Sequence, residues 1–210
     1  MGYESFSGNL LDIIKYFASI TKPHLGFGRV HIHINIGGGQ RNAREAALQA
    51  AKASENLSGL LGGMPFGSFP QAMSMITHSG VFDRYPRLRM VGVEVQAGWV
   101  PTVLAWWDDR YWRNRTMADC QLKKVPSEYF HDNWLVTFII DRFAVKNRED
   151  VGVKNMMWST DYPHHGCDWP YSRKIALEMM ENVPANERYQ ICAGNMVDLY
   201  DLPQTLEPPR

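Results

Sequence analysis

The clearest hydrophobic pattern in the chain lies between residues 29 and 36, where polar and apolar side chains alternate strictly. Such alternation, rich in β-branched residues, is typical of a strand, because successive side chains point to opposite faces. The predicted strand places His31, His33 and Asn35 on one face and three isoleucines on the other. Three glycines, residues 37–39, follow it.

Three further apolar runs predict strands over residues 88–95, 133–140 and 153–160. The first of them is apolar enough to be buried on both faces. Strands and helices alternate along the chain, and this order favours a parallel sheet with covering helices, an α/β fold. Helices are predicted from about residue 8, over 43–61, 68–80, 98–113, 142–150 and 171–181, from 184 to about 193, and again near 195–200.

The spacing of the strands limits how many of them the chain can hold. Their starts lie about 40 residues apart on average, more than the roughly 31 residues per unit of a typical eightfold barrel. Eight such units would need well over about 300 residues, and this chain has 210. If the chain belongs to a barrel, it therefore forms about half of one.

Composition and charge exclude several classes of protein. Hydrophobic residues make up 45% and charged residues 21%, as in ordinary globular chains. Lysine plus arginine and aspartate plus glutamate number 22 each, so no basic surface predicts a nucleic acid or an anionic membrane as partner. The three widely spaced cysteines favour a reducing compartment. With no signal-peptide pattern and no apolar run of about 20 residues, we expect a cytoplasmic protein.

The first strand carries the first candidate site. In a barrel its polar face would point into the lumen, and two imidazoles and an amide there suit a metal or a polar substrate. The alternative is that His31 and His33 are hydrogen-bonded core residues. An HxH pair alone does not decide between these interpretations.

A second candidate follows the fourth strand. Asp161 comes where an inward-facing carboxylate would be catalytic or metal-binding in an α/β barrel, although aspartate before Tyr-Pro is also a common turn residue. His164 and His165 either line the pocket or are solvated loop residues. Glu94 is predicted on the same strand face as Met90, where a carboxylate is costly unless it is paired or functional.

Other chemistries fit poorly. The sequence has no GxSxG motif, and the glycines at 37–39 lack the spacing of a nucleotide-binding loop. Nucleophilic catalysis and phosphate binding are therefore not favoured.

Several segments resemble the amidohydrolase-2 family of metal-dependent TIM-barrel hydrolases, which includes aminocarboxymuconate-semialdehyde decarboxylase. The resemblance covers about residues 10–202, and the block around Asp161 is its most specific part. The segments that carry it are SGVFDRYPRLR at 79–89, Glu94 to Pro101, MWSTDYPHH at 157–165, Trp169-Pro170 and NMVDLY at 195–200.

The resemblance implies a (β/α)8 barrel that holds one divalent metal, usually zinc, with manganese as an alternative. It implies that Asp161 is the metal ligand on the last strand and that His33 is the histidine ligand on strand 5, unless the register places Asn35 there. Relatives often have a catalytic histidine at the end of strand 6, and Glu94 stands in that neighbourhood. The family's first four strands, with their HxH ligands, have no counterpart in the predicted single domain of residues 1–210.

The implied activity is hydrolysis or decarboxylation of a small carboxylated or cyclic substrate. Asp161 and Glu94 would be catalytic, and the substrate-binding residues would be His31, His164, His165 and Trp169. Three hypotheses remain. The chain is part of a longer enzyme, or a half barrel completed by a second copy or a complementing chain, or a non-catalytic binding or structural protein.

Overall fold

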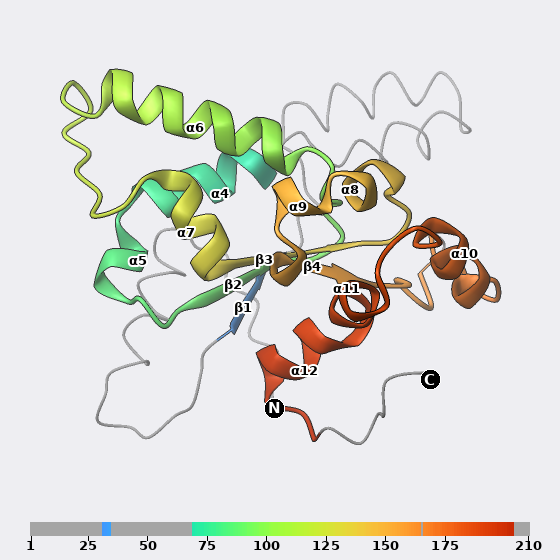
Figure 1. Cartoon of the computed structure of the whole chain (residues 1–210). Coiled ribbons are helices and arrows are strands. Elements are labelled where there is room, and N and C mark those ends of the chain that lie inside the picture. The colour runs from blue at the N-terminus through green and yellow to red at the C-terminus, as the bar shows by residue number, and fades with distance from the viewer. Residues whose placement is uncertain (1–30, 35–68, 165, 204–210) are drawn as a thin grey trace, which may run out of the picture.

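A computed structural model describes residues 31–34, 69–164 and 166–203, with the backbone alone for 31–34 (Figure 1). The described strands form one four-stranded sheet whose spatial order follows the sequence, and every neighbouring pair is parallel. This confirms the predicted α/β fold. The strands are β1 (His31–Ile34), β2 (Arg89–Gly92), β3 (Trp134–Phe138) and β4 (Met156–Trp158).

Helices connect each strand to the next. Between β1 and β2 lie α4 (Phe69–His78) and α5 (Val81–Arg84), and between β2 and β3 lie α6 (Val100–Asn114) and α7 (Pro126–Asn133). Before β4 come α8 (Arg142–Lys146), α9 (Arg148–Val151) and the 3-10 turn η2 (Val153–Asn155). After β4 come α10 (Ser172–Met179), α11 (Ala185–Tyr189), the π-helical turn η3 (Gln190–Gly194) and α12 (Asn195–Tyr200). None of these helices is long and apolar enough to cross a membrane.

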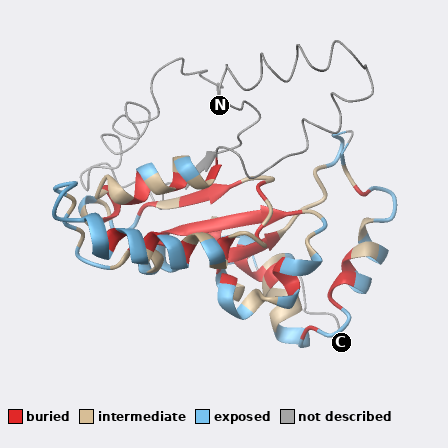
Figure 2. Cartoon of the chain, turned by 90° about the horizontal axis from the view of Figure 1, so that it is seen from above, coloured by how far each residue is buried: buried red, intermediate tan, exposed pale blue. Residues whose placement is uncertain are grey.

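One face of the sheet carries the main core. Trp134 of β3 is fully buried there, and its ring meets those of Phe69 and Phe82 edge-on at centroid distances of 6.0 and 5.9 Å. Phe69 also packs directly over Gly92 of β2, where a Cβ atom would clash with its ring. Helices α4 to α9 therefore bury their apolar sides on this face, and Figure 2 shows the buried residues concentrated in the strands and along the helices beside them.

The opposite face has a smaller cluster. Val91, Leu135 and Met157, from three adjacent strands, pack there with Leu199 of α12. In Figure 1, α12 lies on the other side of the sheet from α6 and α7. In the described part of the chain, α12 is thus the helix that covers this face.

The predicted elements differ from the observed ones mainly at their ends. The strand predicted over 88–95 ends at Gly92, because the chain turns at once into a left-handed conformation at Glu94. The helix predicted over 142–150 is two short helices, and α5 and α7 were not predicted. The helices predicted from residue 8 and over 43–61 lie outside the described residues.

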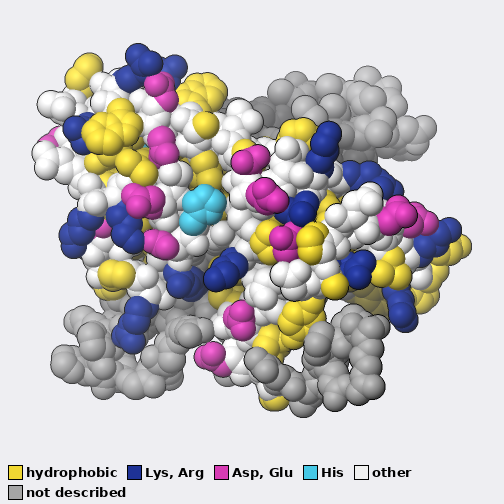
Figure 3. Space-filling model, in the orientation of Figure 1, with side chains coloured by type: hydrophobic (Ala, Val, Ile, Leu, Met, Phe, Trp, Pro, Cys, Tyr) yellow, Lys and Arg dark blue, Asp and Glu magenta, His cyan; other side chains and the backbone are white. Residues whose placement is uncertain are grey.

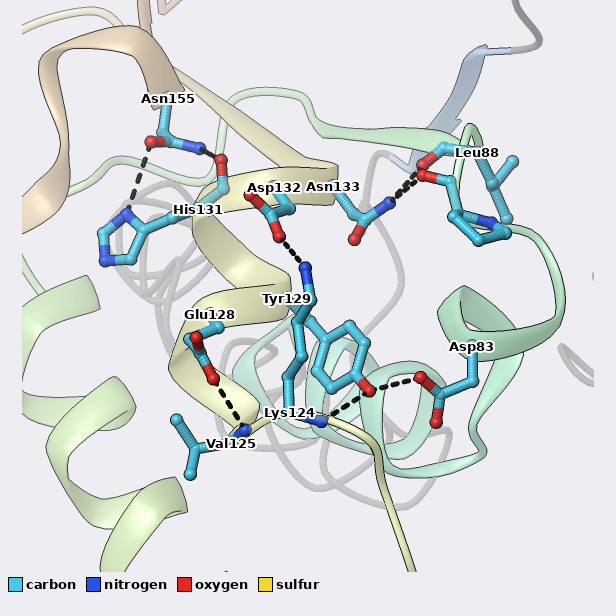
Figure 4. A network of polar contacts seen from close by, with 11 residues as sticks. Asp83, Leu88, Lys124, Val125, Glu128, Tyr129, His131, Asp132, Asn133 and Asn155 are labelled. Carbon is cyan, nitrogen blue, oxygen red and sulfur yellow. Dashed lines mark hydrogen bonds and ion pairs between the residues drawn. The ribbon is translucent and has the colours of Figure 1, made fainter.

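A buried asparagine, Asn155, secures the chain just before β4. Its Nδ2 donates hydrogen bonds to the carbonyl oxygens of Phe130, His131 and Trp134, at 3.2, 3.0 and 2.7 Å. These carbonyls belong to the end of α7 and the start of β3, and the bonds to Phe130 and Trp134 are buried. Figure 4 shows the amide reaching across to His131. Asn155 thus fixes the entry of β4 to that of β3.

Two more buried asparagines act in the same way along this edge. Asn133, at the end of α7, donates to the carbonyls of Pro86 and Leu88 just before β2, at 3.0 and 2.8 Å (Figure 4). Asn195, at the start of α12, donates to the carbonyls of Val153, just before β4, and of Met156, the first residue of β4, at 2.7 and 2.6 Å. Side-chain amides therefore tie neighbouring strand entries together.

Replacing Asn155 with alanine is expected to lower the free energy of unfolding by about 2–4 kcal/mol, because buried carbonyls lose their donor. Urea unfolding measures the change. The matched control is Asn147→Ala, since that amide donates to Phe143 in exposed surroundings, and we expect a change within about 0.5 kcal/mol. Equal losses for the two variants would contradict this role for Asn155.

A second contact set joins α7 to α5 (Figure 4). The Tyr129 hydroxyl donates to Asp83 and accepts a hydrogen bond from the Lys124 amide at 3.1 Å. Burial, followed by the hydrogen bond to Asp83, raises the pKa of Tyr129 to about 12. The folded chain therefore favours the neutral phenol more than the unfolded chain does.

This pKa predicts a loss of stability in alkali. The neutral Tyr129 phenol contributes fully to the free energy of unfolding below the ordinary tyrosine pKa of about 10. This contribution is lost as the pH rises from there through about 12. We expect the urea midpoint of Tyr129→Phe to fall less across that window than that of the unmodified chain. Tyr171→Phe, at an exposed tyrosine, serves as control and should follow the unmodified chain. If the urea midpoints of all three proteins fell equally, the loss of stability in alkali would not come from Tyr129.

Candidate functional site

The loops that follow β2, β3 and β4 lie at one end of the parallel sheet, and we call residues 93–98, 139–141, 159–164 and 166–171 the carboxyl edge. Three of these residues have a left-handed backbone without being glycine: Glu94, Gln96 and Asp161, with φ of 59°, 60° and 55°. Each such conformation costs on the order of 1 kcal/mol, and residues of this kind concentrate at functional sites. The carboxyl edge is therefore the candidate site.

The turn after β2 is held by groups from the β3 side. The Glu94 amide donates to Oγ1 of Thr137, a buried residue of β3, at 2.7 Å. One oxygen of Asp141 accepts hydrogen bonds from the amides of Ala97 and Gly98 at 2.9 and 2.8 Å. These bonds offset the cost of the turn and fix the position of Glu94 at the sheet end.

Asp161 is the carboxylate that follows β4. Its side chain is 14% exposed, and its Oδ2 lies 3.0 Å from Nδ1 of His164, whose side chain is 54% exposed. The His164 amide also donates to the Asp161 carbonyl at 2.8 Å, so a tight turn brings the two side chains together. The structure therefore presents a half-buried carboxylate next to an accessible imidazole, a pair that can exchange a proton or bind a cation.

Two large aromatic side chains of the loop that carries this pair are exposed on the carboxyl edge. Tyr162 and Trp169 are 61% and 62% exposed, and their ring centroids lie 5.5 Å apart. After β3, Ile140 and Phe143 of α8 are also exposed. Exposed aromatic rings near a carboxylate are suited to a flat ligand with a polar group.

The other predicted site residues are placed less completely. His31 and His33 lie on β1, in register with Arg89 and Val91 of β2, and their side chains are outside the described part. His165 and Asn35 are also outside it. The predicted position of Glu94 on the strand face of Met90 was wrong, because the strand ends two residues earlier.

Sequence reasoning missed several residues of this edge. Among the described residues, Oε1 of Gln96 and Oδ2 of Asp168 are buried and have no hydrogen-bond partner. The other oxygen of Asp168 accepts a hydrogen bond from the Ser172 hydroxyl at 2.5 Å. A buried polar atom without a partner needs an explanation, and a bound ligand is one. No motif distinguishes these residues in the sequence.

The described residues supply only part of a metal site. Asp161 has the chemistry of a ligand for a divalent metal, and it lies where the family resemblance predicts one. Among the side chains of residues 69–164 and 166–203, however, no three histidine, cysteine, aspartate or glutamate side chains lie together. Protein metal sites that are catalytic generally use three protein ligands, so further ligands would have to come from elsewhere.

Comparison with known proteins identifies the class. The model of the amidohydrolase family matches residues 25–202, and the chain belongs to this family. None of the curated proteins compared matches the chain significantly.

Solved structures with a similar fold include decarboxylases. A dihydroxybenzoic acid decarboxylase from Polaromonas sp., solved with manganese and 2-nitroresorcinol, is 20% identical with a TM-score of 0.58, covering 82% of this chain and 50% of its own. 5-Carboxyvanillate decarboxylase from Sphingomonas paucimobilis is 23% identical with a TM-score of 0.55, and the match covers 74% of this chain and 46% of the decarboxylase. An amidohydrolase from Mycobacterium avium subsp. paratuberculosis is 15% identical with a TM-score of 0.67, and the match covers 92% of this chain and 45% of the amidohydrolase.

These matches show the fold. The four described strands with their helices correspond to part of a TIM barrel, and the chain spans about half the length of the matched structures. This confirms the prediction that the chain has the fold of about half a barrel. Because these chains are under 25% identical, the catalytic residues and substrates remain predictions.

The role of Thr137 can be tested at one amide. In Thr137→Val the Glu94 amide loses its acceptor, and we expect its hydrogen exchange to accelerate at least about tenfold, since a lost hydrogen bond costs about 1–2 kcal/mol. Thr137→Ser keeps the oxygen and should leave exchange at Glu94 nearly unchanged. Nuclear magnetic resonance measures the exchange of the Glu94 amide. Equal exchange rates in Thr137→Val and Thr137→Ser would contradict this contact.

Proposed function

We propose that this chain forms the C-terminal half of a metal-dependent barrel enzyme that decarboxylates a small aromatic carboxylate. The family match over residues 25–202, together with the Asp161 carboxylate at the end of β4, carries the proposal. Decarboxylation is favoured over hydrolysis because two of the similar structures are decarboxylases of aromatic acids. Hydrolysis of a small cyclic substrate is the alternative within the same family.

Asp161 would hold a divalent metal together with His33 or the neighbouring Asn35 and with ligands outside the described part of the chain. Manganese is as good a candidate as zinc, since a similar decarboxylase was solved with manganese. When bound, the metal would supply a Lewis acid for the substrate carboxylate or carbonyl.

The chain's own residues suggest how a substrate would be bound. The rings of Tyr162 and Trp169 can hold an aromatic ring at the carboxyl edge. The Asp161 carboxylate can accept a proton, and His164, 3.0 Å away, can stabilise either charge state of that carboxylate. Glu94, fixed through its amide by Thr137, would contact the substrate or orient water.

The barrel would be closed by strands beyond the four described ones. In the described sheet, β1 pairs only with β2 and β4 only with β3. Strand edges favour further pairing, and a barrel removes them. We propose that a longer form of the chain, a second copy or a complementing chain supplies the missing strands and metal ligands.

A second candidate function is that of a non-catalytic binding or structural protein. The observation that favours it is that the described residues hold no group of three metal ligands. The two candidates differ in one measurable property, the binding of a metal that depends on Asp161.

Metal content by mass spectrometry tests the proposal on protein purified without chelators, in each oligomeric form. We expect about one manganese or zinc ion per chain, and Asp161→Asn should lose most of it, because an amide is a much weaker ligand than a carboxylate. Asparagine also tolerates the left-handed backbone, so the fold should persist. The control is Asp119→Asn, at another aspartate with positive φ.

A metal retained by Asp161→Asn would overturn the assignment of Asp161. Absence of metal from every oligomeric form would favour the non-catalytic candidate. For the metal-loaded protein, release of carbon dioxide from hydroxybenzoates then separates decarboxylation from hydrolysis.

A further inference from the structure

A groove runs between α4 and α6, in the helical layer that covers the main core. Its volume is about 880 Å³, within the range of small-molecule sites. Residues 103, 106, 107, 110, 111, 114 and 115 line it from α6 and the following residue, so it follows most of that helix. The groove lies between the two helices, with Ala118 and Cys120 of the segment that follows α6 also lining it, and it shares no residue with the carboxyl edge.

Several large aromatic and apolar side chains line the groove. Trp107 and Tyr111 are buried beneath it, and the His78 ring meets Trp107 edge-on at 5.8 Å. Met75 and Trp106, which also line it, are each 59% exposed. Large apolar side chains left in water at one place are typical of a binding surface.

Two arginines give the groove a positive end. The guanidinium of Arg110 lies over the Trp106 ring at 5.6 Å, and that of Arg115 lies over Trp112 at 4.2 Å. Neither has an ion-pair partner in the described structure, and no aspartate or glutamate lines the groove. Arg113 of the same helix, in contrast, is paired with Asp109 at 2.8 Å.

Polarity therefore changes along the groove. Pro70 and Val103 line it near the starts of α4 and α6, whereas His78, Arg110 and Arg115 line it near their ends. In Figure 3, hydrophobic and basic side chains lie together over the far end of α6, with acidic side chains among them. The carboxylate of Asp109 is paired with Arg113, and the partial negative charge of about half a unit at a helix end is smaller than the charge of the two guanidinium groups that line the groove.

We propose that this groove binds an anionic amphiphile, a carboxylate attached to an elongated apolar or aromatic body. The apolar body would lie against Trp107, Tyr111 and Met75, and the carboxylate would bind at the end of the groove that Arg110 and Arg115 line. Charge complementarity favours this occupant over a second copy of the chain or a neutral ligand.

The test measures the binding of dodecanoate and of naphthoate to the whole chain by tryptophan fluorescence and by calorimetry. Both have the required chemistry, and the better binder shows whether an aliphatic or an aromatic body is preferred. Dodecanol is the neutral control. We expect saturable binding of at least one acid, at least about tenfold weaker binding of dodecanol, and weaker binding of the acid at high salt.

The combined substitution Arg110→Gln and Arg115→Gln should weaken acid binding at least about tenfold, because both charge-assisted contacts are lost. Arg113→Gln, at the paired arginine of the same helix, should leave it within about twofold. Circular dichroism checks that each variant folds, and the salt dependence of the unmodified chain tests the proposal without any variant.

Three results would overturn the proposal. They are no saturable binding of either acid, equal binding of dodecanol, and a loss in Arg113→Gln as large as in the double variant. A fourth is a dimer, detected by sedimentation, that Trp106→Ser dissociates, since it would identify a second copy as the occupant.

Discussion

Strands β2, β3 and β4 are each entered through a segment whose backbone carbonyls are bonded by a buried side-chain amide, and the packing of the described sheet depends on these bonds. Unpaired, each of these carbonyls would cost about 1–3 kcal/mol. Asn133, Asn155 and Asn195 provide the donors, and each is only 3–5% exposed. Because each amide bonds a segment that enters a different strand, it satisfies carbonyls and also sets the register between neighbouring units.

This arrangement leaves the opposite end of the sheet free to carry strain. Glu94, Gln96 and Asp161 all have left-handed backbones on the carboxyl edge, and Thr137 and Asp141 bond the turn after β2. A sheet held only by its carboxyl edge could not tolerate several such residues, since each costs on the order of 1 kcal/mol. α/β barrels usually divide these roles: the amino ends of the strands stabilise the fold, and their carboxyl ends carry the chemistry.

The hydrophobic pattern predicted all four strands because burial on one or both faces shows directly in the sequence. It placed their ends too late, since nothing in the apolar run reveals that Glu94 turns left-handed. Helix α7 was missed because it is only eight residues long and owes its position to distant contacts. One of them, the bond from Asn133 to Pro86, spans 47 residues of sequence, which no local pattern records.

The sequence predicts a candidate site at the carboxyl ends of the strands, but the geometry of that site could not be predicted, and the reason is the architecture. A metal site in a barrel draws its ligands from several strands, and they converge only when the sheet closes. Asp161 can be recognised from its motif, yet in the described structure its carboxylate meets His164, a neighbour in sequence. The groove between α4 and α6 differs in this respect, because two adjacent helices complete it. Its binding property therefore belongs to this half of the barrel, whereas a metal site requires the strands and ligands that close it.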